Sequence, residues 1–189
     1  MSLSVVLLAE GTGDLGENLL RGPRSRIDDE DLGPAHVLLS RALAEVRGVP
    51  RAAIQFFEPN RTARGTLARG SVLKHRRSLR QLINYLPAQR PDLIIVLVDA
   101  DGDSSTEATL EGFLSDMPGS RVIAVAVQEF ETWLLDEPSG ERLQPREAKA
   151  KLAAVAPSRA ARKSLAETVD LDALKKRAAS FDRCLRKLR

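Results

Sequence analysis

Hydrophobic positions along the chain fall into four short, mainly apolar runs, separated by longer stretches in which apolar residues recur at helical spacing among polar ones. The runs cover residues 4–9, 52–57, 93–98 and 121–127. Short apolar runs rich in Val and Ile are typical of strands that are buried on both faces. The pattern therefore predicts four strands of a sheet that is covered by helices on its two sides.

The stretches between the runs have helical periodicity. Gly33 and Pro34 open a predicted helix over 34–47, and further helices are expected over 71–86, over 106–113, near 130–135 and from residue 146 onward, with a break near Pro157. Strands that alternate with helices predict an α/β protein. We expect a Rossmann-like, mostly parallel four-stranded sheet flanked by helices, with a core over residues 1–140 and a basic helical extension over 141–189, forming one domain.

Composition narrows the functional classes. The 189 residues are 43% hydrophobic and 29% charged, which is ordinary for a globular protein. Aromatic residues make up only 4%, which disfavours a base-stacking platform, and the single cysteine excludes an internal disulfide or a multi-cysteine zinc site. The first residues lack a basic signal segment and no apolar run approaches about 20 residues, so a cytoplasmic protein with no membrane partner is expected.

The net charge of +3 is unevenly distributed. Of the 29 Lys and Arg residues, 14 lie in residues 141–189, whereas only 6 of the 26 Asp and Glu residues do. This segment therefore carries a charge of +8 and the remainder carries −5. An acidic centre beside a basic segment suits a metal site that holds a polyanion, although a solvated helical face explains the basic segment equally well.

Acidic residues follow three of the four predicted strands. They are Glu10 and Asp14 after the first strand, Asp99, Asp101 and Asp103 after the third, and Glu129 and Glu131 after the fourth. The carboxyl ends of parallel strands lie at one edge of a sheet, so these side chains are expected to converge. Crowded carboxylates repel one another, and Mg²⁺ or Mn²⁺ would relieve that repulsion by taking their oxygens as ligands.

Some of these acids have plainer explanations. Asp14 and Asp103 could cap the helices that follow them, and Glu131 could be an exposed helix residue. Glu10, Asp99 and Asp101 are harder to explain in that way, because they stand where buried strands emerge. If the cluster is repulsive without metal, replacement of Asp99 or Asp101 by Ala is expected to stabilise the metal-free fold.

Glu10 after the first strand and the pair Asp99-Ala100-Asp101 after the third make the chain resemble the TOPRIM fold, the metal-binding domain of topoisomerases, primases and several nucleases. More narrowly, the chain resembles a family of small stand-alone bacterial TOPRIM proteins of unestablished activity, similar to the nuclease domain of the overcoming-lysogenization-defect family. The shared segments are residues 10–14, 98–103, 127–134 and the region of 180–188. The family usually has Thr-Glu where this chain has Gly13-Asp14.

The resemblance implies metal-dependent cleavage of phosphodiester bonds in nucleic acid. Glu10, Asp99 and Asp101 would hold Mg²⁺ or Mn²⁺, and Glu129 or Glu131 would complete a second site. Glu10 could instead act as a general acid or base. Members of the family often accompany an ATPase of the ABC/SMC class, which the resemblance suggests as a partner.

Basic residues provide candidates for contacts with phosphate. Lys149 could supply a catalytic cation near the scissile phosphate. Residues expected to bind nucleic acid are Arg64, Arg69, Lys74, Arg76, Arg77 and Lys151. The same residues could simply form the solvent faces of helices. The sequence leaves open whether the substrate is DNA or RNA, and whether one or two metals bind.

Other functional classes remain open. The chain could be a non-catalytic metal- or nucleic-acid-binding subunit that regulates an ATPase complex. Residues 11–16 match the Gly-x-Gly-x-x-Gly fingerprint of dinucleotide-binding proteins, but the next strand ends far too late for that motif. Residues 99–103 resemble the start of a calcium loop or the signature of aspartyl-phosphate hydrolases, without the positions that complete either motif.

Overall fold

The centre of the molecule is a four-stranded sheet in which all strands are parallel, as seen in a computed structural model that describes residues 2–11, 15, 25–62, 64–67, 70–126, 130–135 and 143–189. Its strands are β1 (Leu3–Ala9), β2 (Ile54–Phe57), β3 (Leu93–Asp99) and β4 (Arg121–Ala126). They lie in the order β2-β1-β3-β4. The α/β class and the parallel sheet predicted from the sequence are confirmed.

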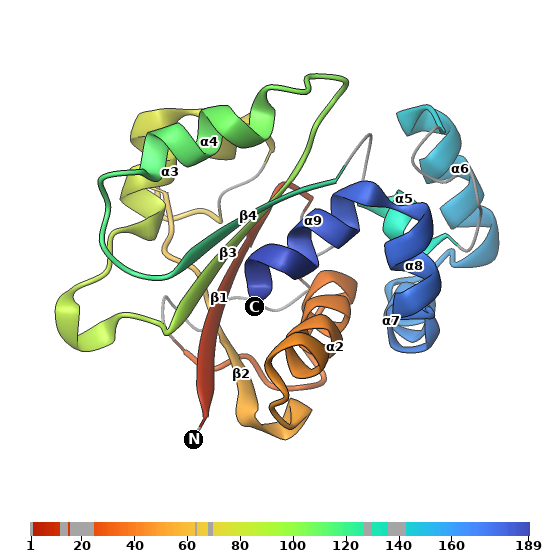
Figure 1. Cartoon of the computed structure of the whole chain (residues 1–189), viewed down its shortest axis with the longest axis horizontal. Coiled ribbons are helices and arrows are strands. Elements are labelled where there is room, and N and C mark those ends of the chain that lie inside the picture. The colour runs from red at the N-terminus through yellow and green to blue at the C-terminus, as the bar shows by residue number, and fades with distance from the viewer. Residues whose placement is uncertain are drawn as a thin grey trace.

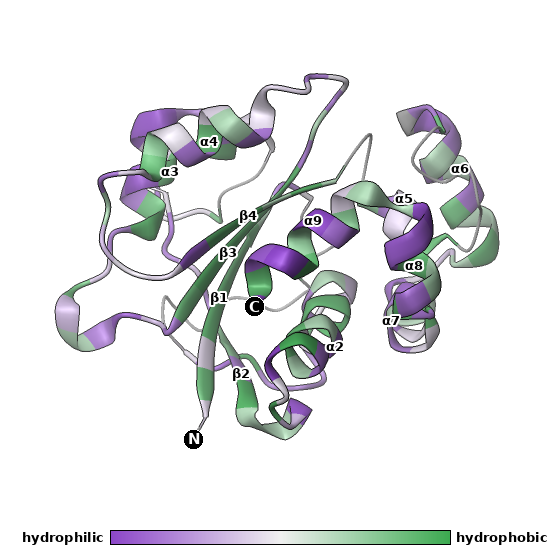
Figure 2. Cartoon of the chain, in the orientation of Figure 1, coloured by the Kyte–Doolittle hydropathy of each residue, from purple (hydrophilic) through white to green (hydrophobic). Residues whose placement is uncertain are grey.

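Helices cover both faces of the sheet (Figure 1). α2 (Pro34–Arg47) and α9 (Ala179–Leu188) pack on one face, whereas α3 (Arg76–Ile83) and α4 (Thr106–Leu114) pack on the other. Alternate residues of each strand point to opposite sides, so that Leu7 joins one hydrophobic cluster and Leu8 the other. Figure 2 shows largely green, apolar strands between helices that carry both green and purple residues.

Helix α2 begins and ends where local sequence signals place it. Pro34 stands in the first turn of α2, and Gly48 ends that helix with φ of 63°, a left-handed conformation that glycine adopts at little cost. The remaining helices are α5 (Glu131–Leu134), α6 (Pro145–Val155), α7 (Arg159–Thr168) and α8 (Leu171–Arg177). Within the described residues, no helix is long and apolar enough to cross a membrane.

The prediction of one continuous helix over 71–86 was wrong in its bounds. The chain instead forms a 3₁₀ helix, η2 (Gly70–Lys74), then an extended residue, His75, and only then α3, which ends at Ile83. The backbone N–H of Gly70 donates to the carbonyl of Glu10 at 2.9 Å, and the side chain of Lys74 reaches the same residue. These contacts tie the segment to the end of β1, and a continuous helix is replaced by a tighter turn and a break.

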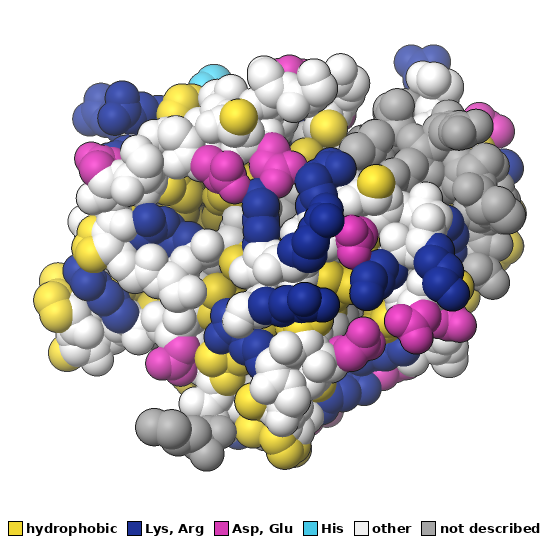
Figure 3. All heavy atoms as spheres, viewed as in Figure 1, with side chains coloured by type: hydrophobic (Ala, Val, Ile, Leu, Met, Phe, Trp, Pro, Cys, Tyr) yellow, Lys and Arg dark blue, Asp and Glu magenta, His cyan; other side chains and the backbone are white. Residues whose placement is uncertain are grey.

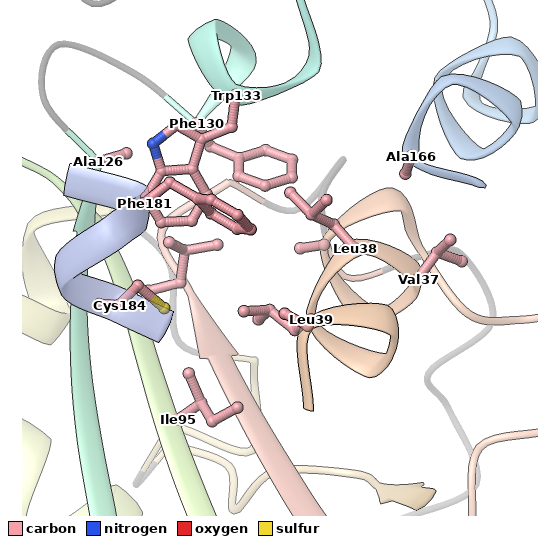
Figure 4. Packing of buried hydrophobic residues seen from close by; sticks show 14 of the residues in the cluster. Val37, Leu38, Leu39, Ile95, Ala126, Phe130, Trp133, Ala166, Phe181 and Cys184 are labelled. Atoms are coloured by element: carbon pink, nitrogen blue, oxygen red, sulfur yellow. The ribbon is translucent and has the colours of Figure 1, made fainter. Parts of the chain in front are cut away.

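Aromatic packing fixes the segment after β4. The rings of Phe130 and Trp133 lie 5.9 Å apart edge to face, and Trp133 contacts Phe181 of α9 at 5.2 Å in the same manner. The Trp133 indole donates to Ser180 Oγ at 2.9 Å, so its polar atom is satisfied in the core. Figure 4 shows these rings grouped above Leu38 of α2. These contacts hold α5 against α9 beside the end of the sheet.

Candidate metal centre at the carboxyl end of the sheet

Two acids meet where β1 and β3 end. Glu10 follows β1 directly and continues its pairing with β3, since its backbone N–H donates to the carbonyl of Leu97 at 3.1 Å. Asp99 is the last residue of β3. Its backbone N–H donates to Glu10 Oε2 at 3.1 Å. The register of two neighbouring parallel strands therefore places Glu10 and Asp99 side by side, as the sequence predicted for acids at this edge.

A tight turn presents the third acid. Ala100–Asp103 closes with a backbone hydrogen bond of 2.8 Å, and its central residues Asp101 and Gly102 have φ of 49° and 80°. Positive φ at both positions defines a type I′ turn, for which Asp-Gly is a preferred sequence. A left-handed non-glycine residue costs free energy and is concentrated at functional sites. Here it holds a carboxylate that is 58% exposed.

A lysine lies between two of the acids. Lys74 Nζ is 2.6 Å from Asp101 Oδ2 and 3.2 Å from Glu10 Oε2. Burial alone would lower the pKa of Lys74, but its hydrogen bonds to Asp101 and Glu10 and their negative charges outweigh burial and hold the pKa above its ordinary value. Lys74 therefore stays charged and neutralises part of the cluster.

Asp99 is held by the segment that follows β4. Its Oδ1 accepts a hydrogen bond from the backbone N–H of Phe130 at 2.8 Å. Because Phe130 is locked by its contact with Trp133, the carboxylate is oriented by the hydrophobic core. These bonds change the stability expected from repulsion alone. Loss of Asp99 in the metal-free protein would leave a buried N–H donor without its acceptor, which destabilises the fold.

Asp103 makes local hydrogen bonds just before α4, but the N-cap of that helix is Ser105, and no described side chain makes a capping hydrogen bond there. The Oδ1 of Asp103 accepts from the backbone N–H of Ser105 at 2.8 Å and from the Ser105 hydroxyl at 2.7 Å, immediately before α4. These hydrogen bonds hold the pKa of Asp103 below its ordinary value. Glu131 is the first residue of α5 and is half-buried. Asp14 and Glu129 lie outside the described residues, and their predicted roles stay predictions.

The expected nucleic-acid-binding residues occupy several surfaces. Arg76 and Arg77 are exposed in the first turn of α3, two and three residues after Lys74. Arg64 is exposed and lines a groove of about 350 Å³ beside α3. Arg69 lies outside the described residues. On α6, Lys149 is exposed and Lys151 lies 3.9 Å from Glu147.

Cations of the C-terminal helices are used largely for internal contacts. Figure 3 shows Lys and Arg side chains across the face that α9 and α2 form. Arg47 Nε donates to the carbonyl of Leu188 at 2.6 Å, and Arg183 and Lys187 both bind Glu107 of α4. The excess of positive charge in residues 141–189 therefore serves in part to attach these helices to the sheet.

The donor chemistry of the cluster fits a hard divalent cation. Carboxylate oxygens are preferred ligands of Mg²⁺, and oxygens of Glu10 and Asp101 already face one cation. As the side chains lie, however, no three Asp, Glu, His or Cys residues in the described part of the chain are arranged closely enough to hold a metal. Lys74 takes the position between the two acids.

The central position of Lys74 was not predicted; the sequence suggested Lys74 only as a contact for phosphate and suggested Lys149 as the catalytic cation. One signal was present. Lys74 is the only lysine among residues 1–148, in a region otherwise served by arginine. Lysine presents a compact point charge on a flexible stem, which suits a place between two carboxylates better than the planar fork of arginine.

Comparisons with known proteins do not identify the chain. No family model, no curated protein and no solved structure matches it.

Proposed function

We propose that this protein is a TOPRIM-type nuclease that cleaves phosphodiester bonds in nucleic acid with the help of Mg²⁺ or Mn²⁺. The observation that carries the proposal is that Glu10 and Asp101 share one cation, Lys74, while the backbone N–H of Asp99 bonds to Glu10, at the carboxyl ends of two adjacent parallel strands. Ligands of open α/β sheets bind at this edge. The acids match the motif positions on which the resemblance to the TOPRIM fold rests.

Glu10, Asp99 and Asp101 would hold the metal. A divalent ion at such a place neutralises charge on a phosphate and activates the attacking water or stabilises the leaving oxygen. The chain itself supplies orientation. The backbone N–H of Asp99 fixes Glu10, and the backbone N–H of Phe130 fixes Asp99, so two of the three carboxylates are positioned before any ligand arrives.

Positive charge beside the cluster supports a polyanionic substrate. Arg76 and Arg77 occupy the first turn of α3, where the helix dipole makes cations unfavourable, and no side chain caps this end. An anion at the same end is favoured both by the dipole and by the two guanidinium groups. Because this turn follows Lys74 directly, a strand bound to it would pass close to the acids.

The test is cleavage of supercoiled DNA, single-stranded DNA and RNA by wild-type protein, Asp99→Asn and Asp116→Asn, with Mg²⁺, with Mn²⁺ and with chelator. Asp116 is a matched control, since it is an exposed acid paired with Arg80. We expect metal-dependent cutting by wild type and Asp116→Asn but not by Asp99→Asn. Equal cutting by all three proteins would indicate a contaminating nuclease and contradict the proposal.

A non-catalytic role is the second candidate. Mn²⁺ and oligonucleotide binding without cleavage, by the protein alone and with an ABC/SMC-class ATPase added, would favour a regulatory subunit. Cleavage that appears only when the ATPase is added would instead support a nuclease that depends on its partner.

A further inference from the structure

Lys74 and a metal ion would compete for the carboxylates of Glu10 and Asp101. The lysine ammonium contacts Asp101 Oδ2 and Glu10 Oε2, one oxygen of each of two carboxylates that would bind the metal. Two positive charges that share one pair of carboxylate oxygens repel each other strongly in a partly buried setting. Lys74 and the metal therefore cannot both keep these contacts.

The surroundings of Lys74 allow it to leave. Its side chain is 25% exposed and belongs to a short 3₁₀ helix that ends at an extended residue, His75. The backbone of that 3₁₀ helix is anchored separately, through the bond from Gly70 to the carbonyl of Glu10. A rotation of the lysine side chain can therefore free both carboxylates without dismantling the segment.

Resting on the function proposed above, we propose that Lys74 is an exchangeable counter-cation: it holds Glu10 and Asp101 in the metal-free protein and is displaced from them when a divalent metal binds. The exchange keeps the acid cluster stable without metal. It also lowers the affinity for metal, because binding has to displace an ion pair. The displaced ammonium remains beside Arg76 and Arg77, where phosphate groups of a substrate would lie.

The experiment is calorimetric titration of Mn²⁺ into metal-free full-length protein at fixed pH and ionic strength, with no nucleic acid present. The variants are Lys74→Met, Lys74→Arg and Lys175→Met. Lys74→Met removes the charge and keeps the length of the side chain. Lys175 is an exposed lysine of α8, so Lys175→Met repeats the same substitution and the same change in net charge elsewhere.

We expect Lys74→Met to bind Mn²⁺ about 10- to 100-fold more tightly than wild type, because the competing cation is gone. Lys175→Met should stay within about 2-fold of wild type, since exposed distant charges are screened. Lys74→Arg should bind no more tightly than wild type, because a guanidinium can hold both carboxylates.

Unchanged or weaker Mn²⁺ binding by Lys74→Met would overturn the exchange while leaving the metal centre intact. If Lys74→Met does not fold, tighter binding by Lys74→Arg than by wild type would overturn it equally. Absence of Mn²⁺ binding in every protein would overturn the proposed function together with the inference.

Discussion

Two lysines in this molecule are each shared by two carboxylates, and the two sites differ in the backbone that carries the acids. Lys74 lies between Glu10 and Asp101 at the carboxyl end of the sheet. Lys187 of α9 binds Glu107 and Glu111 of α4. Ion pairing alone would assign both groups the same role.

The backbone that carries the acids distinguishes the Lys187 site from the Lys74 site. Glu107 and Glu111 stand one turn apart on a regular helix, where like charges are mildly destabilising unless a cation neutralises them. Lys187 supplies that cation and also donates to the carbonyl of Ile123 in β4, an edge strand. It therefore fastens two helices across the edge of the sheet. Asp101, in contrast, sits on a turn in a left-handed conformation, which costs a non-glycine residue backbone free energy.

The largest difference is expected in catalysis. If the proposed function holds, Asp99→Asn should lower metal-dependent cleavage by about 100-fold or more, since it removes a charged oxygen from the proposed metal centre. Glu107→Gln, the equivalent change in the Lys187 group, should leave the rate per folded molecule within about 2-fold. Initial rates on whichever substrate the wild type cuts measure both. A similar loss in the two variants would remove the functional distinction between the groups.

The fold could be predicted because its signals are local. Val- and Ile-rich runs such as residues 93–98 can only be satisfied between two apolar layers, and Pro34 and Gly48 mark the ends of a helix whose bounds matched the prediction. The segment 70–83 failed for the opposite reason. Its break at His75 depends on contacts with Glu10, which is some 60 residues away in the chain, and helical periodicity carries no information about such partners.

The sequence predicted that acids would meet at this edge of the sheet, but it did not predict that Lys74 would lie between two of them. Asp99 and Glu10 could be placed together because parallel strands bring their carboxyl ends to one edge. The bridge from Lys74 depends on how the chain between β2 and β3 folds back over β1, which no spacing rule describes. The hydrogen bonds that Asp103 accepts from Ser105 are local to the turn before α4, and they leave the metal prediction for Asp103 open.

Stability without metal should distinguish the lysines next. Lys187→Met should lower the free energy of unfolding by about 2 kcal/mol, because Glu111 and the carbonyl of Ile123 lose the donor and Glu107 keeps, among the described residues, only Arg183. Lys74→Met should lower it by about 1 kcal/mol. Saturating Mn²⁺ should recover the loss in Lys74→Met only, since the metal replaces the missing charge. Urea unfolding with chelator and with Mn²⁺ measures both effects. Recovery of both variants by Mn²⁺ would show that the Lys187 group also binds metal.

Unfolding at alkaline pH tests whether the charge of Lys187 stabilises the fold. Burial would lower the pKa of Lys187, but hydrogen bonds to Glu107 and Glu111 outweigh it and raise the pKa above its ordinary value. A raised pKa in the folded state contributes stability that is fully present below the unfolded pKa, about 10.4, and is lost as the pH rises through the folded value. The difference in unfolding free energy between wild type and Lys187→Met should therefore shrink as the pH rises above about 10.4. A constant difference would mean that packing of the side chain, and not its charge, stabilises the helices.

The smallest expected effect concerns the backbone at Asp101. Asp101→Ala and Asp101→Asn both remove the charge that faces Lys74, but asparagine tolerates φ of 49° and alanine does not. In the metal-free protein we expect Asp101→Ala to be less stable than Asp101→Asn by about 1 kcal/mol, as measured by urea unfolding. Glu111→Ala and Glu111→Asn provide the matched pair on the regular helix α4, where alanine should be the more stable residue because of its helix propensity. Opposite signs at the two positions would establish that the acidic edge is held in a strained turn while the Lys187 group is not. Equal signs would mean that the turn at residues 100–103 relaxes in solution, and that the strain which sets this acid apart from Glu111 is absent.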